Sequence, residues 1–144
     1  MIIDVKYTTV AQVPAMPRIR ENERTDYGLR RDGTAYGVYG MMFIKNRVDY
    51  LVCRTEDLPS FLPSWLFDVR DSSLPSGWKI CNVVYDKGYF PLYKKFGVSC
   101  LVGYEELVTN PIHYEGIIDL EEDDLRIFFR IKNKIDLELY GRVI

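Results

Sequence analysis

The sequence has few of the residues that metal binding and nucleophilic catalysis require. It contains one histidine, His113, and three cysteines, none of them in a Cys-x-x-Cys arrangement. A zinc site needs three or four such ligands at a recognisable spacing, and a Cys–His nucleophile needs a partner base. Neither a Gly-x-Ser-x-Gly motif nor a phosphate-binding loop motif is present. The sequence therefore predicts no enzyme, no cofactor and no metal site, and we expect His113 on the surface or in a helix cap.

Long apolar runs and an excess of charge of one sign are also missing. The apolar run Val38–Ile44 is far shorter than the ~20 residues that span a bilayer. Only two apolar residues separate Met1 from Asp4, which does not match a signal peptide. Nineteen basic and 21 acidic residues give a net charge of −2, which disfavours a general nucleic-acid binder. We expect a cytoplasmic protein with no membrane partner and no direct nucleic-acid partner.

Length and composition indicate an ordinary globular domain. The 144 residues are 47% hydrophobic and 28% charged, which predicts a single domain over residues 1–144. Aromatic residues reach 14%, with eleven tyrosines, and this fits either an aromatic-rich β core or a protein-binding face. Cys53, Cys81 and Cys100 lie in apolar runs and are odd in number, so we expect unbridged, buried thiols.

Alternating and β-branched segments predict strands over most of the chain. The clearest signal is a hairpin of Tyr36–Ile44 and Val48–Cys53 around a polar turn. Further strands are predicted at Ile2–Thr9, Trp78–Tyr85 and Val98–Tyr104. The intervening segments are predicted as a solvated loop at Arg18–Gly33, a covering segment at Thr55–Gly77 with a helical turn around Ser64–Phe67, and a short strand or loop at Tyr89–Phe96. We expect Phe43, Leu51, Trp78 and Val84 to share one core.

The last third of the chain changes character. Asn110 followed by a proline predicts a capped helix over Pro111–Ile117. Asp119 as N-cap with Glu122 at N3 predicts a helix over Leu120–Lys132, although alternation in that segment leaves a strand open. Ile135–Tyr140 is predicted as a strand. Because short links favour antiparallel pairing, the expected fold is α+β, a mainly antiparallel sheet of about five to six strands with helices covering one face.

One charge feature stands out in a chain that is otherwise nearly neutral. Between residues 115 and 124 there are six acids and no basic residue: Glu115, Asp119, Glu121, Glu122, Asp123 and Asp124. Acids at a helix start interact favourably with the helix dipole, and that is the plain explanation. The functional alternative is a patch that binds a basic protein partner and steers its approach.

The segment from Leu74 to Arg130 carries a resemblance. It reads LPSGWKI, then GVSCLVGYEELV, then NPIHYEGIIDLEEDDLRIFFR, and it resembles immunity proteins of bacterial polymorphic toxin and contact-dependent growth inhibition systems. The resemblance implies a cytoplasmic inhibitor that occludes a cognate toxin C-terminal domain, often a nuclease, and catalyses nothing itself. The alternative from the residues is a small cytosolic enzyme or ligand-binding protein with a pocket lined by tyrosines and carboxylates.

Overall fold

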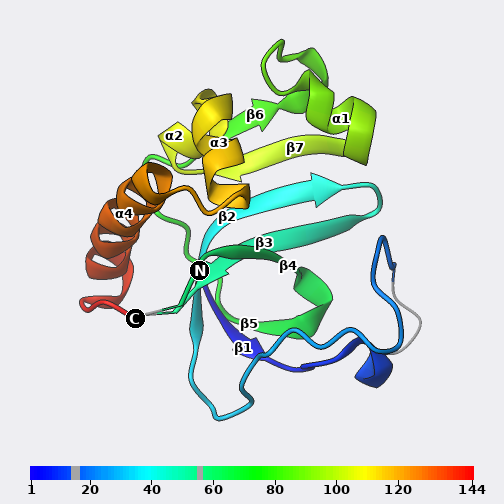
Figure 1. Ribbon diagram of the computed structural model, residues 1–144. Helices are drawn as coiled ribbons and strands as arrows, with labels where there is room; N and C mark the ends of the chain where they lie inside the picture. Colours follow the sequence, from blue (N-terminus) through cyan, green and yellow to red (C-terminus); the bar gives the residue numbers. More distant parts are fainter. Residues whose placement is uncertain (14–16, 55–56) are drawn as a thin grey trace.

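The computed structural model describes residues 1–13, 17–54 and 57–144, which form an antiparallel sheet with helices packed on one face (Figure 1). The strands are β1 Ile2–Val5, β2 Tyr36–Ile44, β3 Arg47–Cys53, β4 Ser60–Pro63, β5 Phe67–Asp71, β6 Lys79–Asn82 and β7 Val98–Gly103. The helices are α1 Phe90–Phe96, α2 Glu105–Thr109, α3 Pro111–Ile118 and α4 Glu122–Tyr140, with single 3₁₀ turns at Val10–Gln12, Ser64–Leu66 and Val83–Tyr85. The α+β class is confirmed, and the described residues supply seven strands instead of five to six.

The sheet branches at its central strand, β2. One edge of β2 pairs with β3, which confirms the predicted hairpin. The other edge is divided, because Tyr36 and Gly37 pair with β1 while the residues from Gly40 to Ile44 pair with β7. The register shifts between Val38 and Gly40, so the two branches separate at a bulge that holds Tyr39. The strand orders β4-β3-β2-β1-β5 and β6-β7-β2 describe the two branches.

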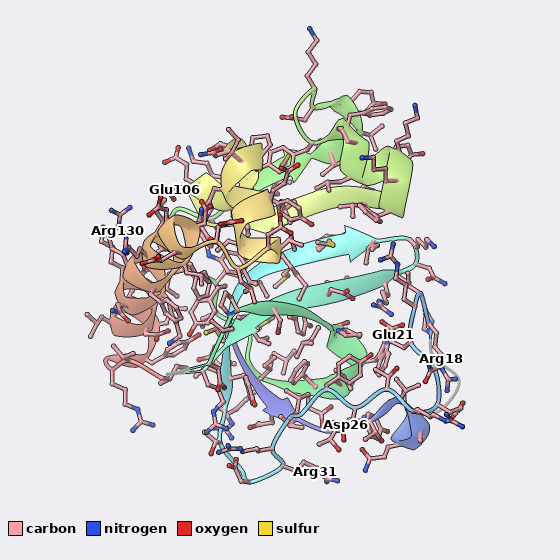
Figure 2. All side chains as sticks on the ribbon, in the orientation of Figure 1. Arg18, Glu21, Asp26, Arg31, Glu106 and Arg130 are labelled. Atoms are coloured by element: carbon pink, nitrogen blue, oxygen red, sulfur yellow. The ribbon has the colours of Figure 1, made fainter. Side chains whose placement is uncertain are left out.

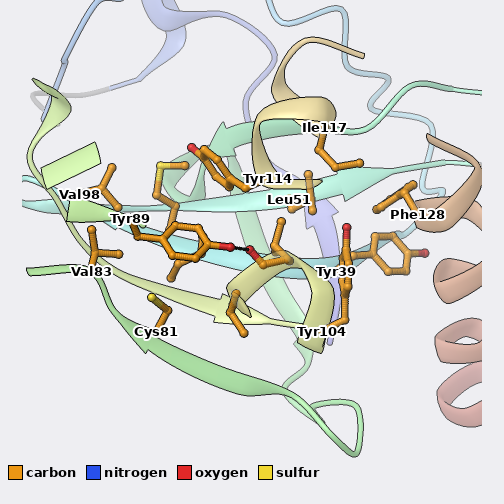
Figure 3. Close-up of a cluster of buried hydrophobic side chains, with 14 of the residues drawn as sticks. Tyr39, Leu51, Cys81, Val83, Tyr89, Val98, Tyr104, Tyr114, Ile117 and Phe128 are labelled. Carbon is orange, nitrogen blue, oxygen red and sulfur yellow. Dashed lines mark hydrogen bonds between the residues drawn. The ribbon is translucent and has the colours of Figure 1, made fainter. Parts of the chain in front are cut away.

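Two hydrophobic cores lie on opposite faces of this sheet. Tyr39 and Leu51 belong to the core beneath the helices, where Tyr39 meets Phe128 of α4 edge to face (Figure 3). Val38 and Val52, one residue away along their strands, belong to the core enclosed by the β1–β5 branch. Neighbouring strand residues point to opposite faces, so a continuously apolar strand fills both cores.

The prediction that four residues share one core is therefore wrong. Leu51 is fully buried under the helices, whereas Trp78 packs against the opposite core. Phe43 is 38% exposed, and Val84 is only half-buried in the turn after β6. Apolar identity in a strand does not specify which face of the sheet is covered at that point.

Two intervening segments form regular structure that the sequence analysis did not predict. Within Thr55–Gly77, β4 and β5 join the sheet, with the expected helical turn between them; residues 55 and 56 lie outside the described residues. Tyr89–Phe96 was predicted as a strand or loop, but it holds α1, with Pro91 in the first turn and Gly97 in the left-handed conformation after the last. Both signals are typical of helix ends.

The charged segment Arg18–Gly33 contains no helix or strand, as expected. Most of its charged side chains, including Arg18, Asp26 and Arg31, lie along the outside of the molecule (Figure 2), whereas Glu21 turns inward.

The helical last third confirms two predictions and corrects two. Asn110 caps α3 by accepting hydrogen bonds from the N–H groups of Ile112 and His113, at 3.1 and 3.3 Å. The segment predicted as Leu120–Lys132 is a helix and not a strand. Asp119, however, is the C-cap of α3, and Glu121 is the N-cap of α4.

The predicted strand Ile135–Tyr140 is wrong, because these residues are the last part of α4, which is 19 residues long. The helix ends before Gly141, whose φ is +67°. The buried residues of α4 are Phe128, Lys132, Ile135 and Asp136. These positions follow the helical period, but two of them are charged. The apolar stripe is therefore interrupted, and the sequence did not predict that the helix continues to Tyr140.

Candidate functional site

The six clustered acids lie at the turn between α3 and α4, and we call this set the acidic corner: Glu115, Asp119, Glu121, Glu122, Asp123 and Asp124. The turn is tightly built. Leu120 adopts a positive φ of 56°, which allows the chain to reverse direction between the helices. The N–H of Glu121 then donates to the carbonyl of Gly116 at 2.8 Å, which closes the end of α3. The acids are therefore held on a fixed backbone.

The structure separates the six acids into three groups. Glu115, Asp119 and Glu121 are exposed and form no ion pair with any described residue. Glu122 and Asp123 are also exposed, and both pair with Arg126 one turn along α4. Asp124 alone turns inward, with 17% of its side chain exposed. Five acids consequently face solvent; Arg126 pairs with two of them, and Lys95 lines the same hollow as Glu115 and Asp119.

Asp124 is the outer member of a buried chain of hydrogen bonds. Its carboxylate lies 2.8 Å from Nδ1 of His113, and Nε2 of His113 lies 2.7 Å from the hydroxyl of Tyr104. His113 is 1% exposed, so the prediction of a surface or capping histidine is wrong. With the proton on Nδ1, the imidazole donates to Asp124 and accepts from Tyr104 at the other nitrogen, and both ring nitrogens are satisfied.

Carboxylate, imidazole and hydroxyl follow the same order here as in a nucleophilic triad. The hydroxyl nevertheless belongs to Tyr104, which is 4% exposed, and burial raises its pKa well above its usual range. A nucleophile needs a lowered pKa and an open approach for the substrate. The three residues instead join the start of α2 to α3 and α4, and the arrangement is a structural tie.

A second buried polar cluster, which we call the enclosed cluster, joins α4 to the bulge of β2. The hydroxyl of Tyr39 donates to Asp136 at 2.6 Å, and the ammonium of Lys132 lies 2.6 Å from the other carboxylate oxygen. The N–H of Ile144 also donates to that oxygen, at 3.1 Å. Lys132 and Asp136 are 1% and 0% exposed. No sequence signal marked this cluster, because its members lie 97 residues apart.

A third polar cluster, the rim cluster, lies at the closed end of the β2–β3 hairpin. Arg47 donates to Glu21 at 2.8 and 2.9 Å and to Asp49 at 2.8 Å. Desolvation alone would raise the pKa of Glu21, but hydrogen bonds from Arg47 and from the N–H of Ile19 outweigh it and lower the pKa to about 2. Desolvation prevails at Asp49, whose pKa is raised although Arg47 contacts it. Arg47 thereby fastens the segment before residue 22 to the sheet.

The cysteines offer no reactive thiol. Cys53 and Cys81 are buried as expected, whereas Cys100 is only half-buried, and none of the three is bridged. Burial raises the pKa of Cys53 to about 12 and that of Cys81 to about 11, so both are protonated thiols at neutral pH. Reactive cysteines require the opposite shift.

Within residues 1–13, 17–54 and 57–144, no three His, Cys, Asp or Glu side chains come together as a metal site would require. Over the same residues, no helix combines the length and the hydropathy needed to cross a bilayer. Comparison of the chain with protein-family models, with curated proteins and with solved structures gave no match.

Proposed function

We propose that this protein acts by binding another protein through the acidic corner, as a non-catalytic inhibitor of a secreted toxin domain. The observation that carries the proposal is the set of five solvent-facing acids on one fixed turn. Helix-dipole stabilisation accounts for acids in the first turn of α4. Glu115, however, lies in the last turn of α3 and Asp119 is its C-cap, and negative charge is unfavourable at that end of a helix. A cationic partner relieves the unfavourable interaction of these acids with the helix dipole and with one another.

The acidic corner is pre-organised for binding. Asp124 is held by His113, and a Cβ at Gly116 would lie only 1.8 Å from its carboxylate oxygen, so the start of α4 sits directly against α3. Asn110 caps the other end of α3. A surface that is already ordered loses little conformational entropy when it binds.

Apolar side chains lie among the acids, as in the centre of a protein interface. Ile118 is 50% exposed and Leu120 is 41% exposed, and both lie between acids in the sequence. On the face of α3 that carries Glu115, Ile112 is 77% exposed. Interfaces combine an apolar centre with a charged, solvated rim. The matching partner surface is basic with an apolar contact, which suits a domain that binds phosphates of nucleic acid.

Enclosure of the other polar clusters favours an inhibitor over an enzyme. The imidazole of His113 and the ammonium of Lys132 are each 1% exposed. General acids and bases must reach their substrate, and neither of these groups reaches the surface. The partner expected from the resemblance, a toxin C-terminal domain, is therefore the one to test first.

The experiment measures association of this chain with the purified C-terminal domain of the protein encoded by the neighbouring gene, by stopped-flow fluorescence at low and high salt. We expect the triple variant Glu121→Gln, Glu122→Gln, Asp123→Asn to associate about tenfold more slowly at low salt, with a smaller difference at high salt. The charge-matched control is Asp68→Asn, Asp71→Asn, Glu138→Gln, on β5 and at the far end of α4.

Equal rates and equal salt slopes for the test and control variants would rule out the acidic corner as the contact surface. Co-expression adds a functional readout, because an inhibitor of the toxin domain restores growth to cells that produce it. A purified pair that does not associate, together with growth that is not restored, would refute the inhibitor function itself.

A further inference from the structure

A hollow of about 300 Å³ lies beside the acidic corner, and we call it the basic groove. Its walls come from the closed end of the β2–β3 hairpin, the end of α1, the outer side of α3, and residues 19–21. Figure 2 shows Glu21 on this last segment, next to the hairpin end. A volume of this size is at the lower end of the range for small-molecule sites.

Hydrogen bonds between its walls fix the shape of the groove. The N–H of Lys45, at the hairpin turn, donates to the carbonyl of Gly97 at 2.9 Å, which fastens the hairpin to the end of α1. On the other side, Arg47 holds Glu21 through two hydrogen bonds, and the indole N–H of Trp65 donates to the carbonyl of Pro17 at 3.2 Å. These hydrogen bonds hold the walls of the groove in place relative to one another.

The floor of the groove is apolar, with one polar group. Met42, Ile44 and Val98 contribute aliphatic surface from the sheet. Tyr114 contributes an aromatic ring that is 6% exposed, and its hydroxyl forms no hydrogen bond with any described residue. The enclosed side-chain polar atoms without a partner in the described chain are the hydroxyl of Tyr27 and the indole nitrogen of Trp78. The hydroxyl of Tyr114 is not among them, so solvent reaches it and it is available to a ligand.

The rim of the groove is cationic. Arg20, Lys45 and Lys95 line it and form no ion pair within the described chain. The guanidinium of Arg20 lies over the ring of Phe96, 5.3 Å from its centroid, which positions this charge at the edge of the apolar floor. Arg47 is the one lining cation with a carboxylate partner in the groove, Glu21. The uncompensated charge at the rim is therefore positive.

We infer that the basic groove binds a small amphipathic anion, an aliphatic or aromatic body carrying one carboxylate or sulfonate. The apolar body lies on the floor, where its burial is favourable. The anionic head meets the cations at the rim, and the hydroxyl of Tyr114 donates to a polar atom of the ligand. Glu115 and Asp119 line an adjoining hollow that shares Lys95, Phe96, Tyr114 and Ile118 with the groove. These two acids offset part of the positive charge of Lys95 and disfavour a ligand with a second negative charge.

The experiment uses anilinonaphthalene sulfonate (ANS), an aromatic sulfonate whose fluorescence rises in apolar sites, with the full chain. We expect saturable one-to-one binding that weakens about tenfold in the double variant Arg20→Glu, Lys95→Glu. Arg24→Glu, Lys94→Glu is the matched control, because it also reverses two charges, one in the same loop and one in the same turn of α1, and neither residue lines the groove. Circular dichroism and thermal unfolding establish that each variant is folded.

Competition tests the two halves of the ligand separately. Octanoate is expected to displace ANS, and octanol, which has the same chain without the charge, is expected to displace it much less. Binding that is unchanged in the double variant, displacement by both competitors alike, or no saturable binding at all would overturn the inference. None of these variants alters an acid of the acidic corner, so the outcome is independent of the proposed protein partner.

Discussion

The enclosed cluster and the rim cluster contain similar groups in opposite settings. In the enclosed cluster, Lys132 and Asp136 lie on the inner face of α4, with 1% and 0% of their side chains exposed. In the rim cluster, water reaches the edges of Arg47 and Glu21, which are 6% and 12% exposed. Both clusters fasten a distant segment to the sheet: α4 in the first case, and the chain before residue 22 in the second.

The comparison separates two ways in which charge stabilises a fold. A fully enclosed pair has already lost its hydration, so removing one partner leaves an unpaired charge in an apolar region. A pair at the rim retains part of its hydration, so its contribution is smaller and depends on pH. The enclosed cluster is expected to govern global stability, and the rim cluster is expected to govern the order of the segment that forms one wall of the basic groove.

The largest expected effect is the loss of Asp136. Asp136→Ala removes the acceptor of Tyr39, Lys132 and the N–H of Ile144 together. We expect the free energy of unfolding to fall by about 3–5 kcal/mol, because the ammonium of Lys132 remains buried without a counter-ion and keeps only the carbonyl of Ile144 as acceptor. Chemical denaturation measures this change.

The double variant Lys132→Met, Asp136→Leu is the control for this result. It removes both charges and fills the space with apolar groups, so it should recover about half of the lost stability. A loss below about 1 kcal/mol for Asp136→Ala would show that water enters the cluster, and the contrast with the rim would then disappear.

The next effect compares two adjacent aspartates. Asp124→Ala leaves the buried imidazole of His113 without its acceptor, and we expect the free energy of unfolding to fall by about 1–3 kcal/mol. Asp123, whose side chain is 91% exposed, is the matched control, and Asp123→Ala should change stability by about 0.5 kcal/mol or less. Similar losses for the two variants would contradict the structural role of the His113 tie.

The rim cluster predicts a pH effect of known sign. The carboxyl of Glu21 binds its proton near pH 4.5 in the unfolded chain and near pH 2 in the folded one. Its contribution is therefore complete above pH 4.5 and is lost as the pH falls toward 2. The shift corresponds to at most about 3 kcal/mol, and solvent screening at the rim leaves about 1–2 kcal/mol.

The measurement is the free energy of unfolding between pH 2 and pH 7 for the native chain and for Glu21→Gln. The difference in free energy of unfolding between the two proteins should be largest at pH 7 and should shrink as the pH falls toward 2. Glu21→Gln weakens the contact with Arg47 that holds residues 17–21 to the hairpin. The amides of these residues should therefore exchange faster at pH 7. A difference independent of pH would show that Glu21 is not ionised against Arg47.

The smallest effect concerns thiol accessibility on the two sides of the sheet. Cys53 lies in the helix-side core, and burial raises the pKa of its thiol to about 12, whereas Cys100 is half-buried on β7. Alkylation of the native protein followed by mass measurement should label Cys100 first and Cys53 last. Labelling of Cys53 at the rate of Cys100 would mean that α4 opens readily.

Much of the fold followed from local patterns that act over a few residues. The hairpin, β7 and the Asn110 cap were predicted because turn and cap residues impose their backbone geometry without help from the rest of the chain. The strands β4 and β5 were missed because Pro59 and Pro63 interrupt their segment, and edge strands tolerate proline. α4 was predicted too short because Lys132 and Asp136 interrupt its apolar stripe.

The acidic corner shows where prediction of the site ended. Six acids were visible in the sequence, and five of them face solvent. The inward turn of Asp124 depends on His113, which lies 11 positions earlier and becomes its neighbour only when α3 and α4 pack together. The basic groove had no sequence signal, because its cations come from a loop, a hairpin turn and α1.

The sequence by itself determined the class of the fold, the central hairpin, the capped helix α3 and the concentration of negative charge, since all of these depend on residue type and short-range spacing. Tertiary structure alone decided which charged groups are enclosed and which face water. Tyr39 meets Asp136 across 97 positions of chain, and Arg47 meets Glu21 across 26. Desolvation depends on everything that packs around a group, so similar charged groups are fully enclosed at α4 and remain partly accessible to water at the hairpin.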